Sequence, residues 1–394
     1  MKKFSLLTAL TLLAGGIMLS PLTANAQDDK QAQLERDTYD ACWVKREEAK
    51  CLPLCTELVE KYPASNYTKN CKARIENKKI ADLEQKFQGA LRDYNDGPNA
   101  NKLEQLFTAG EDVLKVQPGH QFYVAYMALA GANGGLGQFY KNLDKVKGYA
   151  ETALKAFEPT TPPEGWKPEQ WNPLRDLVLA QMNQYLGWRL VEIKGDQEQA
   201  LNYLTKAIQV KGKDGGWKDP NNYLLRSTVY SIQYGETRKP YDAMTDEQKV
   251  SDAGKEIIKK VNALLDTKLI PEYARVLATA TRPEAKEIYD NAKREFDVFW
   301  EFRTGAKDKA PDYIKNYVAD PTIASVPIPA KPEDTSNLNA PAAPTTNPTT
   351  VKLSSGGSAM ATGSKGGANG NGAKSAPAKG KGAKGSSKGK KKRG

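Results

Sequence analysis

The sequence predicts an all-α protein, a solenoid of helical hairpins followed by a disordered C-terminal tail. Three observations lead to this prediction. Apolar residues recur at helical spacing through most of the chain. Alternating apolar and polar runs of the strand type are hard to find before Thr322. Short segments in the middle of the chain recur at intervals of about 50 residues, the sign of a repeated structural unit.

Residues 1–26 have the pattern of a secretory signal peptide. Lys2 and Lys3 precede an apolar run over 4–19, and small residues ending at Ala26 form a cleavage site before Gln27. The run is too short and too weakly flanked for a stable membrane span. We therefore expect an exported protein that begins at Gln27 and resides in the periplasm, with secretion into the medium as the alternative.

The segment 27–95 carries all four cysteines, at Cys42, Cys51, Cys55 and Cys71. An even number in a short stretch of an exported chain predicts two disulfides. A metal or redox site, the alternative, usually needs closer paired spacing. Three connectivities are open, and a Cys51–Cys55 bridge within one helical turn is the least comfortable. We favour Cys42–Cys55 with Cys51–Cys71, which would bind three successive helices together.

Helices are expected in order along this segment. Breakers at Pro63 and at the turn 95–98 separate them. The expected helices cover 31–50, 53–62, a stretch around Cys71 and Ile75, and 80–94.

The segment 96–235 contains the repeat signal. Helices are expected at 103–116, 120–131, 142–157, 173–194 and 198–210, with a flexible Gly-rich bend at 131–137. Two sets of residues recur about 50 positions apart, as expected for helical hairpins with long connectors. They are Gly165-Trp166-Lys167 with Leu174-Arg175, matched by Gly216-Trp217-Lys218 with Leu225-Arg226, and Tyr149 with Ala153-Leu154, matched by Tyr203 with Ala207-Ile208.

These residues resemble tetratricopeptide (TPR) repeats. The nearest stretch is Tyr185-Leu186-Gly187, Gly195-Asp196, Ala200, Tyr203 and Ala207, and the segment 58–65 is similar to the helix end and turn of TPR proteins from bacterial envelopes. Leu186-Gly187 lies one residue out of register, and the proline expected after Val210 is missing. The resemblance implies a stacked solenoid, in which a small residue of the first helix admits the second. It further implies a face that binds peptide or protein partners, without catalysis.

The segment 236–318 is expected to close the array, since a solenoid must cover its last apolar face. Helices are predicted at 245–266, 271–280, 282–303 and 311–318. From residue 319 the composition shifts to Pro, Ala, Thr and Ser and then to Gly, Ser and Lys, so 319–394 is expected to be disordered.

The net charge of +11 resides in the tail. Residues 365–393 contain many basic side chains and no acid, and the rest of the mature chain is close to neutral. A neutral body argues against binding of nucleic acid or membrane by the folded surface. The tail itself could attract an anionic lipid, polysaccharide or nucleic acid. Its candidate contacts are Lys379, Lys381, Lys384, Lys388, Lys390, Lys391, Lys392 and Arg393.

No residue pattern indicates catalysis, a cofactor or a metal. His120 is the only histidine, which excludes the usual multi-histidine zinc sites, and we expect it to cap or pack a helix. The segment 131–137 lacks the Gly-Lys-Ser/Thr ending of a phosphate loop. The tryptophans at 166, 171, 188 and 217 are expected to fill gaps between hairpins, with recognition of a sugar or peptide as the alternative.

The sequence therefore predicts a non-catalytic, exported helical-repeat scaffold that mediates protein–protein interaction in the bacterial envelope. It predicts no small-molecule substrate and no cofactor. The alternative is a polyanion-binding protein that works through its Lys-rich tail.

Overall fold

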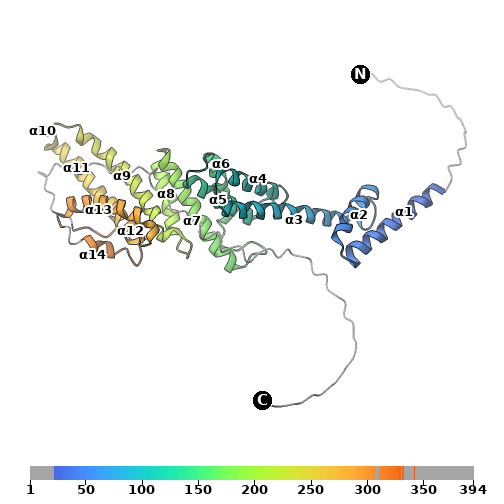
Figure 1. The fold of residues 1–394 in the computed structure, drawn as a ribbon. Helices are drawn as coiled ribbons and strands as arrows, with labels where there is room; N and C mark the ends of the chain where they lie inside the picture. Colours follow the sequence, from blue (N-terminus) through green and yellow to red (C-terminus); the bar gives the residue numbers. More distant parts are fainter. Residues whose placement is uncertain (1–21, 307–309, 330, 332–340, 342–394) are drawn as a thin grey trace, which may run out of the picture. The chain divides into compact units, whose positions relative to one another are not determined.

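The computed structural model describes residues 22–306, 310–329, 331 and 341. These residues form helices, turns and extended connections, and they include no strand (Figure 1). The prediction of an all-α fold is confirmed for this part of the chain.

The N-terminal segment contains three helices and one π-helical turn. They are α1 (Leu22–Tyr39), η1 (Asp40–Val44), α2 (Glu48–Lys61) and α3 (Thr68–Asn95). Two helices were expected around Cys71 and over 80–94, but α3 is one helix of 28 residues. The stretch between the two expected helices is polar but holds no Gly or Pro, so nothing breaks the backbone hydrogen bonds there.

The next five helices follow one another with short or Pro-rich connections. They are α4 (Ala100–Val116), α5 (Gln121–Leu136), α6 (Leu143–Phe157), α7 (Pro168–Glu192) and α8 (Gln197–Gln209). Each packs on its sequence neighbours, and α5 also contacts α7. Side chains of Asn99, Asn142 and Asp196 accept a backbone N–H at the starts of α4, α6 and α8, which fixes where these helices begin.

The Gly-rich segment 131–137 is not the flexible bend that was expected, because α5 continues to Leu136. The buried glycines are used for close packing. A Cβ on Gly134 would lie 2.6 Å from Leu103 Cδ2, and one on Gly135 would lie 2.8 Å from the ring of Tyr185. Burial of the helix here outweighs the low helix propensity of glycine.

Gly187 of α7 likewise allows close packing, in this case against α8. A Cβ at this position would lie 2.6 Å from Leu204 Cγ, and Ala200 and Ala207 of α8 are buried. The close approach of two helices at a small residue, which the TPR resemblance implies, is present here.

The two sets of repeated residues occupy matching elements. Trp166 and Trp217 both lie just before a long helix, α7 in one case and α9 (Pro220–Asp242) in the other. Tyr149 and Tyr203 lie on α6 and α8. Helix α7 contacts α9 as α5 contacts α7. The boundary expected at residue 235 falls inside α9, so the repeated segment and the C-terminal helices share one helix.

The C-terminal helices pack around α9 and α12. The elements are η2 (Gly216–Lys218), α10 (Asp246–Lys249), α11 (Asp252–Leu264), η3 (Leu265–Leu269), α12 (Ile270–Thr279), η4 (Pro283–Ala285), α13 (Lys286–Thr304) and α14 (Ala310–Lys315). The helix expected at 245–266 is divided at Ser251, whose hydroxyl accepts from Gly254 N and starts α11. Helix α12 contacts α9, α13 and α14.

Residues 320–329, which we call the strap, begin with a turn over 321–323, continue without regular secondary structure to 329, and contact α12 and α14. Arg275 of α12 donates to Pro321 O at 2.9 Å, and Val326 and Ile328 pack on the buried side chains of the C-terminal helices. The expectation of disorder from residue 319 is therefore corrected for 319–329. Composition suggested disorder, but these residues obtain their hydrogen bonds from buried side chains of the folded helices.

Among the described residues no helix is both long enough and apolar enough to cross a membrane.

Candidate interaction surfaces

The four cysteines form two adjacent, fully buried disulfides, Cys42–Cys51 and Cys55–Cys71. The expected presence of two bridges is confirmed, but the favoured pairing of Cys42 with Cys55 and Cys51 with Cys71 is wrong. Cys51 and Cys55 share one face of α2, so either can face either partner. Indeed Cys42 Sγ lies only 3.7 Å from Cys55 Sγ, to which it is not bonded.

The sulfurs of Cys42, Cys51 and Cys55 lie within 4.8 Å of one another. All the cysteines are bonded in disulfides, and none is free. A zinc site requires thiolates, so the metal alternative finds no support in this arrangement.

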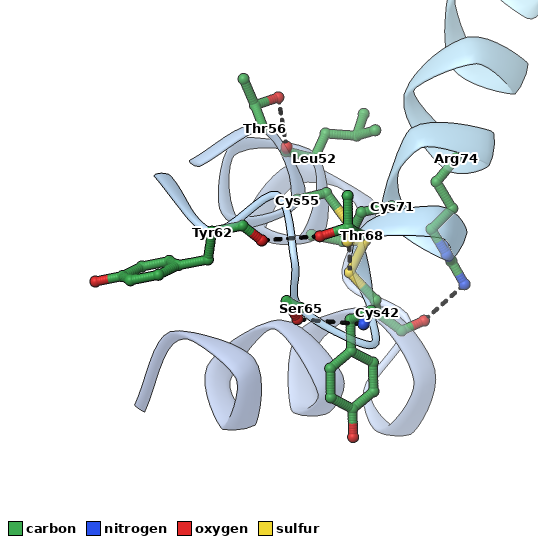
Figure 2. The surroundings of a disulfide bond; sticks show 11 residues. Cys42, Leu52, Cys55, Thr56, Tyr62, Ser65, Thr68, Cys71 and Arg74 are labelled. Atoms are coloured by element: carbon green, nitrogen blue, oxygen red, sulfur yellow. Dashed lines mark hydrogen bonds between the residues drawn. A yellow bond between two sulfur atoms is a disulfide. The ribbon is translucent and has the colours of Figure 1, made fainter. Parts of the chain in front are cut away.

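The Cys42–Cys51 bridge joins η1 to α2, and the Cys55–Cys71 bridge fixes the connection between α2 and α3. In that connection Ser65 Oγ accepts from Tyr67 N at 3.2 Å, and Thr68 Oγ1 donates to Tyr62 O at 3.0 Å (Figure 2). Arg74 of α3 reaches across and donates from Nη2 to Cys42 O at 2.8 Å (Figure 2). Each element of this segment is thus tied to the next by covalent or polar contacts.

An aromatic cluster of Tyr39, Trp43 and Tyr67 lies on this support. Trp43 is 6.1 Å from Tyr39 and 5.8 Å from Tyr67 between ring centroids, and the Tyr39 and Trp43 rings are stacked with an interplanar angle of 22°. The guanidinium carbon of Arg74 lies 5.2 Å from the centroid of the Trp43 ring. Tyr39 is 48% exposed, the neighbouring Val44 is 59% exposed, and Trp43 and Tyr67 are partly exposed.

This cluster was not expected from the sequence. Tyr39 and Trp43 are four residues apart on one helical face, which is a signal that could have been noticed. Tyr67 comes from the loop before α3 and is brought to them by the Cys55–Cys71 bridge, which no local pattern indicates.

His120 occupies the N-cap position of α5 without making a side-chain cap. Its ring packs 4.7 Å from the ring of Tyr123, and burial lowers the pKa of His120 below its usual value. Its Nδ1 has no hydrogen-bond partner among the described residues. The ring packs at a helix start, as expected, and no nucleophile accompanies it in the contacts described.

A cluster of charged and hydroxyl side chains joins α4 and α6. Lys145 Nζ lies 3.0 Å from Glu104 Oε2 and 3.4 Å from Glu111 Oε1, and the hydroxyls of Tyr140 and Tyr149 donate to these two carboxylates. The hydrogen bond from Tyr140 lowers the pKa of Glu104. The lowered pKa favours the charged form of Glu104, so this is an ion-pair network that joins the two helices.

The tryptophans of the repeats divide into two kinds. Trp171 and Trp188 are buried and pack as expected, with Trp171 stacked 4.7 Å from Phe157. Trp166 and Trp217 are partly exposed at the starts of α7 and α9, and Lys218 Nζ lies 4.3 Å from the Trp217 ring.

Two further sets of residues were predicted as sites. Ala26 and Gln27 lie in the first turns of α1. The polyanion candidates Lys379, Lys381, Lys384, Lys388, Lys390, Lys391, Lys392 and Arg393 lie outside the described residues.

Comparison of the chain with protein-family models, with curated proteins and with solved structures finds no match.

Proposed function

We propose that this chain is an exported, non-catalytic scaffold of helical hairpins that binds a protein partner through the aromatic cluster of its disulfide-bonded segment. The observation that carries the proposal is the exposure of Tyr39 and the partial exposure of Trp43 and Tyr67 beside Arg74. Tyr, Trp and Arg are the residues most often found at the energetic centres of protein interfaces.

The support beneath the cluster favours binding. Two disulfides and the hydrogen bond from Arg74 to Cys42 hold the aromatic rings before a partner arrives. A surface fixed in this way loses little conformational entropy when it binds.

The rest of the body fits the role of a spacer and scaffold. Consecutive helices pack through small residues, as α7 does at Gly187 against Leu204 of α8, and α7 also contacts both α5 and α9. We propose that these hairpins form a TPR-like solenoid, in which each repeat contacts only the repeats next to it.

Export is proposed on two grounds. The first is the signal-peptide pattern ending at Ala26. The second is the pair of buried disulfides, because such bridges persist mainly in oxidising compartments such as the periplasm.

The test is a pull-down from envelope extract with the protein beginning at Gln27. Four forms are compared at low and high salt: the unchanged protein, a Tyr39→Ala/Trp43→Ala variant, an Ile193→Ala/Val298→Ala control and a form without residues 365–394. Ile193 and Val298 are exposed apolar residues elsewhere, at 51% and 50%. Thermal melting of the variants shows whether each is folded.

The proposal predicts that one partner is captured at both salt concentrations, and equally by the unchanged protein, the control and the tailless form. The Tyr39→Ala/Trp43→Ala variant should capture about tenfold less of it, or still less. Capture that depends on the tail and falls steeply with salt would instead support the polyanion-binding alternative. Equal capture by the aromatic variant and the control would refute the aromatic cluster as the binding surface.

A further inference from the structure

Main-chain groups of the strap are hydrogen-bonded to side chains of the body, in addition to the side-chain contacts of Asp320 with Lys211 and of Ser325 with Thr267 O. Arg275 donates from Nε to Pro321 O at 2.9 Å and from Nη2 to Ile323 O at 2.8 Å. These contacts recognise carbonyl groups that any residue supplies, so they do not depend on the strap's side chains at those positions.

Two tyrosines hold both polar groups of Val326. The Val326 N–H donates to Tyr317 OH at 2.9 Å, and Tyr313 OH donates to Val326 O at 2.8 Å. The two hydroxyls lie 3.3 Å apart, so Tyr317 can donate to Tyr313 and close a ring of hydrogen bonds around one residue. The pairing of both N–H and C=O is what a neighbouring β-strand would provide.

From Val326 to Pro329 the strap's side chains alternate between the helices and the solvent. Val326 and Ile328 are partly buried against the C-terminal helices, whereas Pro327 and Pro329 are exposed. A proline has no N–H to donate, and the described contacts use no N–H at these two positions. The last four residues of the strap, 326–329, thus have an apolar–Pro–apolar–Pro pattern.

The groups that hold the strap are positioned by the body itself. Glu272 Oε1 accepts from Arg275 Nη1 at 2.7 Å and from Arg226 Nη2 at 3.0 Å, and the Arg275 guanidinium lies 4.8 Å from the Tyr317 ring centroid. Tyr313 is 5% exposed and Tyr317 is fully buried. Arg275 is thus held by groups outside the strap, as a preformed binding site requires.

We propose that the surface formed by Arg275, Tyr313 and Tyr317 is a binding site for an extended peptide with alternating apolar and proline residues, and that the strap occupies it within the same chain. A partner segment with the same pattern would replace the strap. The proposal goes beyond the aromatic cluster, because it assigns a second surface and a defined class of ligand. A tethered occupant competes at high effective concentration, so the unmodified protein should bind an added peptide weakly.

The test measures binding of a fluorescent peptide with the sequence of residues 319–329 to the full chain by anisotropy. A Val326→Asp/Ile328→Asp variant weakens the strap without altering the surface beneath it. Pro327→Ala, at an exposed strap position, is the matched control. Adding Tyr317→Phe to the strap variant removes the hydroxyl that receives Val326 N–H and keeps the ring.

The expected result is about tenfold tighter peptide binding by the strap variant than by the unchanged protein or the control. Tyr317→Phe should then weaken this binding again by about fivefold to tenfold, as the loss of a buried hydrogen bond does. Hydrogen exchange of 320–329 and circular dichroism accompany the titration.

Three results would overturn the proposal. The strap variant could exchange its strap amides freely and still bind no better than the unchanged protein. The strap could stay protected from exchange in that variant, or the variant could lose its helices. The last two results would make the strap a fixed part of the fold. None of these results depends on the aromatic cluster. Failure of the peptide-binding proposal would therefore leave the proposed function to be tested separately by the envelope pull-down.

Discussion

The guanidinium of Arg275 lies over the ring of Tyr317, 4.8 Å from its centroid, and the two side chains hold consecutive parts of the strap. Arg275 donates hydrogen bonds to the carbonyls of Pro321 and Ile323, and the Tyr317 hydroxyl accepts one from the N–H of Val326. One cation–π contact therefore connects α12 to the residues after α14 and to the strap that contacts both.

Replacement of Arg275 by Met should destabilise the protein by about 3–5 kcal/mol. The change leaves Glu272, 1% exposed, with Arg226 as its remaining described cationic partner, and it removes the donors of two strap carbonyls. Urea unfolding followed by tryptophan fluorescence measures the loss. Arg294→Met is the control, because Arg294 bonds only at an exposed site with Asn291 and should change stability by less than about 0.5 kcal/mol. Similar losses in both variants would show that the buried ion group contributes little.

The packing of α7 against α8 can be tested with two glycines. Gly187→Ala should destabilise the protein by about 1–3 kcal/mol, because the added Cβ would lie 2.6 Å from Leu204 Cγ. Gly148→Ala on α6 is the matched control, since no atom lies within 4 Å of its added Cβ. There alanine should stabilise the helix by about 0.5–1 kcal/mol. Thermal and urea unfolding give both values, and opposite signs are required.

The disulfide pairing can be read from peptides of the unreduced protein. Digestion that cuts between Leu54 and Cys55 should yield fragments joining Cys42 to Cys51 and Cys55 to Cys71, by mass spectrometry. A fragment joining Cys42 to Cys55 would contradict the structure. Replacing either bonded pair with alanines should cost roughly 2–4 kcal/mol. The cost should be somewhat larger for Cys55–Cys71, whose sequence separation is 16 rather than 9.

The sequence predicted the helical class and most helix positions because apolar spacing reports the buried face of each helix directly. The prediction from sequence was wrong where tertiary packing determines the local conformation. Nothing local distinguishes a bend at Gly134 and Gly135 from a helix pressed against Leu103 and Tyr185. Turn-forming composition therefore suggested a loop at a place where the absence of side chains is what allows the helices to meet.

The candidate surfaces were less predictable than the fold. Cys42 lies close to both Cys51 and Cys55, so sequence spacing could not select its partner. The order of the strap depends on Arg275, which is remote in sequence from the carbonyls that it binds. Composition measures how much apolar area a segment can bury by itself, and it does not register hydrogen bonds supplied by another element.

Tyr94 should make stability depend on alkaline pH. It lies at the end of α3, 1% exposed, where its hydroxyl donates to Ala130 O at 3.0 Å and accepts from Asn133 Nδ2 at 2.9 Å. Burial raises the pKa of Tyr94 to about 12, against a small opposing effect of Asn133. The contribution is fully present below the ordinary pKa near 10, because the hydroxyl is then protonated in both the folded and the unfolded chain. It is lost as the pH rises from about 10 to 12, where the unfolded chain ionises first.

The measurement is urea unfolding of the unchanged protein and of Tyr94→Phe at pH 8 and at pH 11. At pH 8 the variant should be less stable by about 0.5–1.5 kcal/mol, the usual contribution of a hydrogen bond. At pH 11 the difference should shrink or reverse, because phenylalanine has no proton to lose. Other buried tyrosines are common to both proteins, so their ionisation cancels in the comparison. Tyr39→Phe at the exposed aromatic cluster is the control. A difference between Tyr94→Phe and the unchanged protein that stays constant over this pH range would show that Tyr94 ionises equally readily in the folded and unfolded chain.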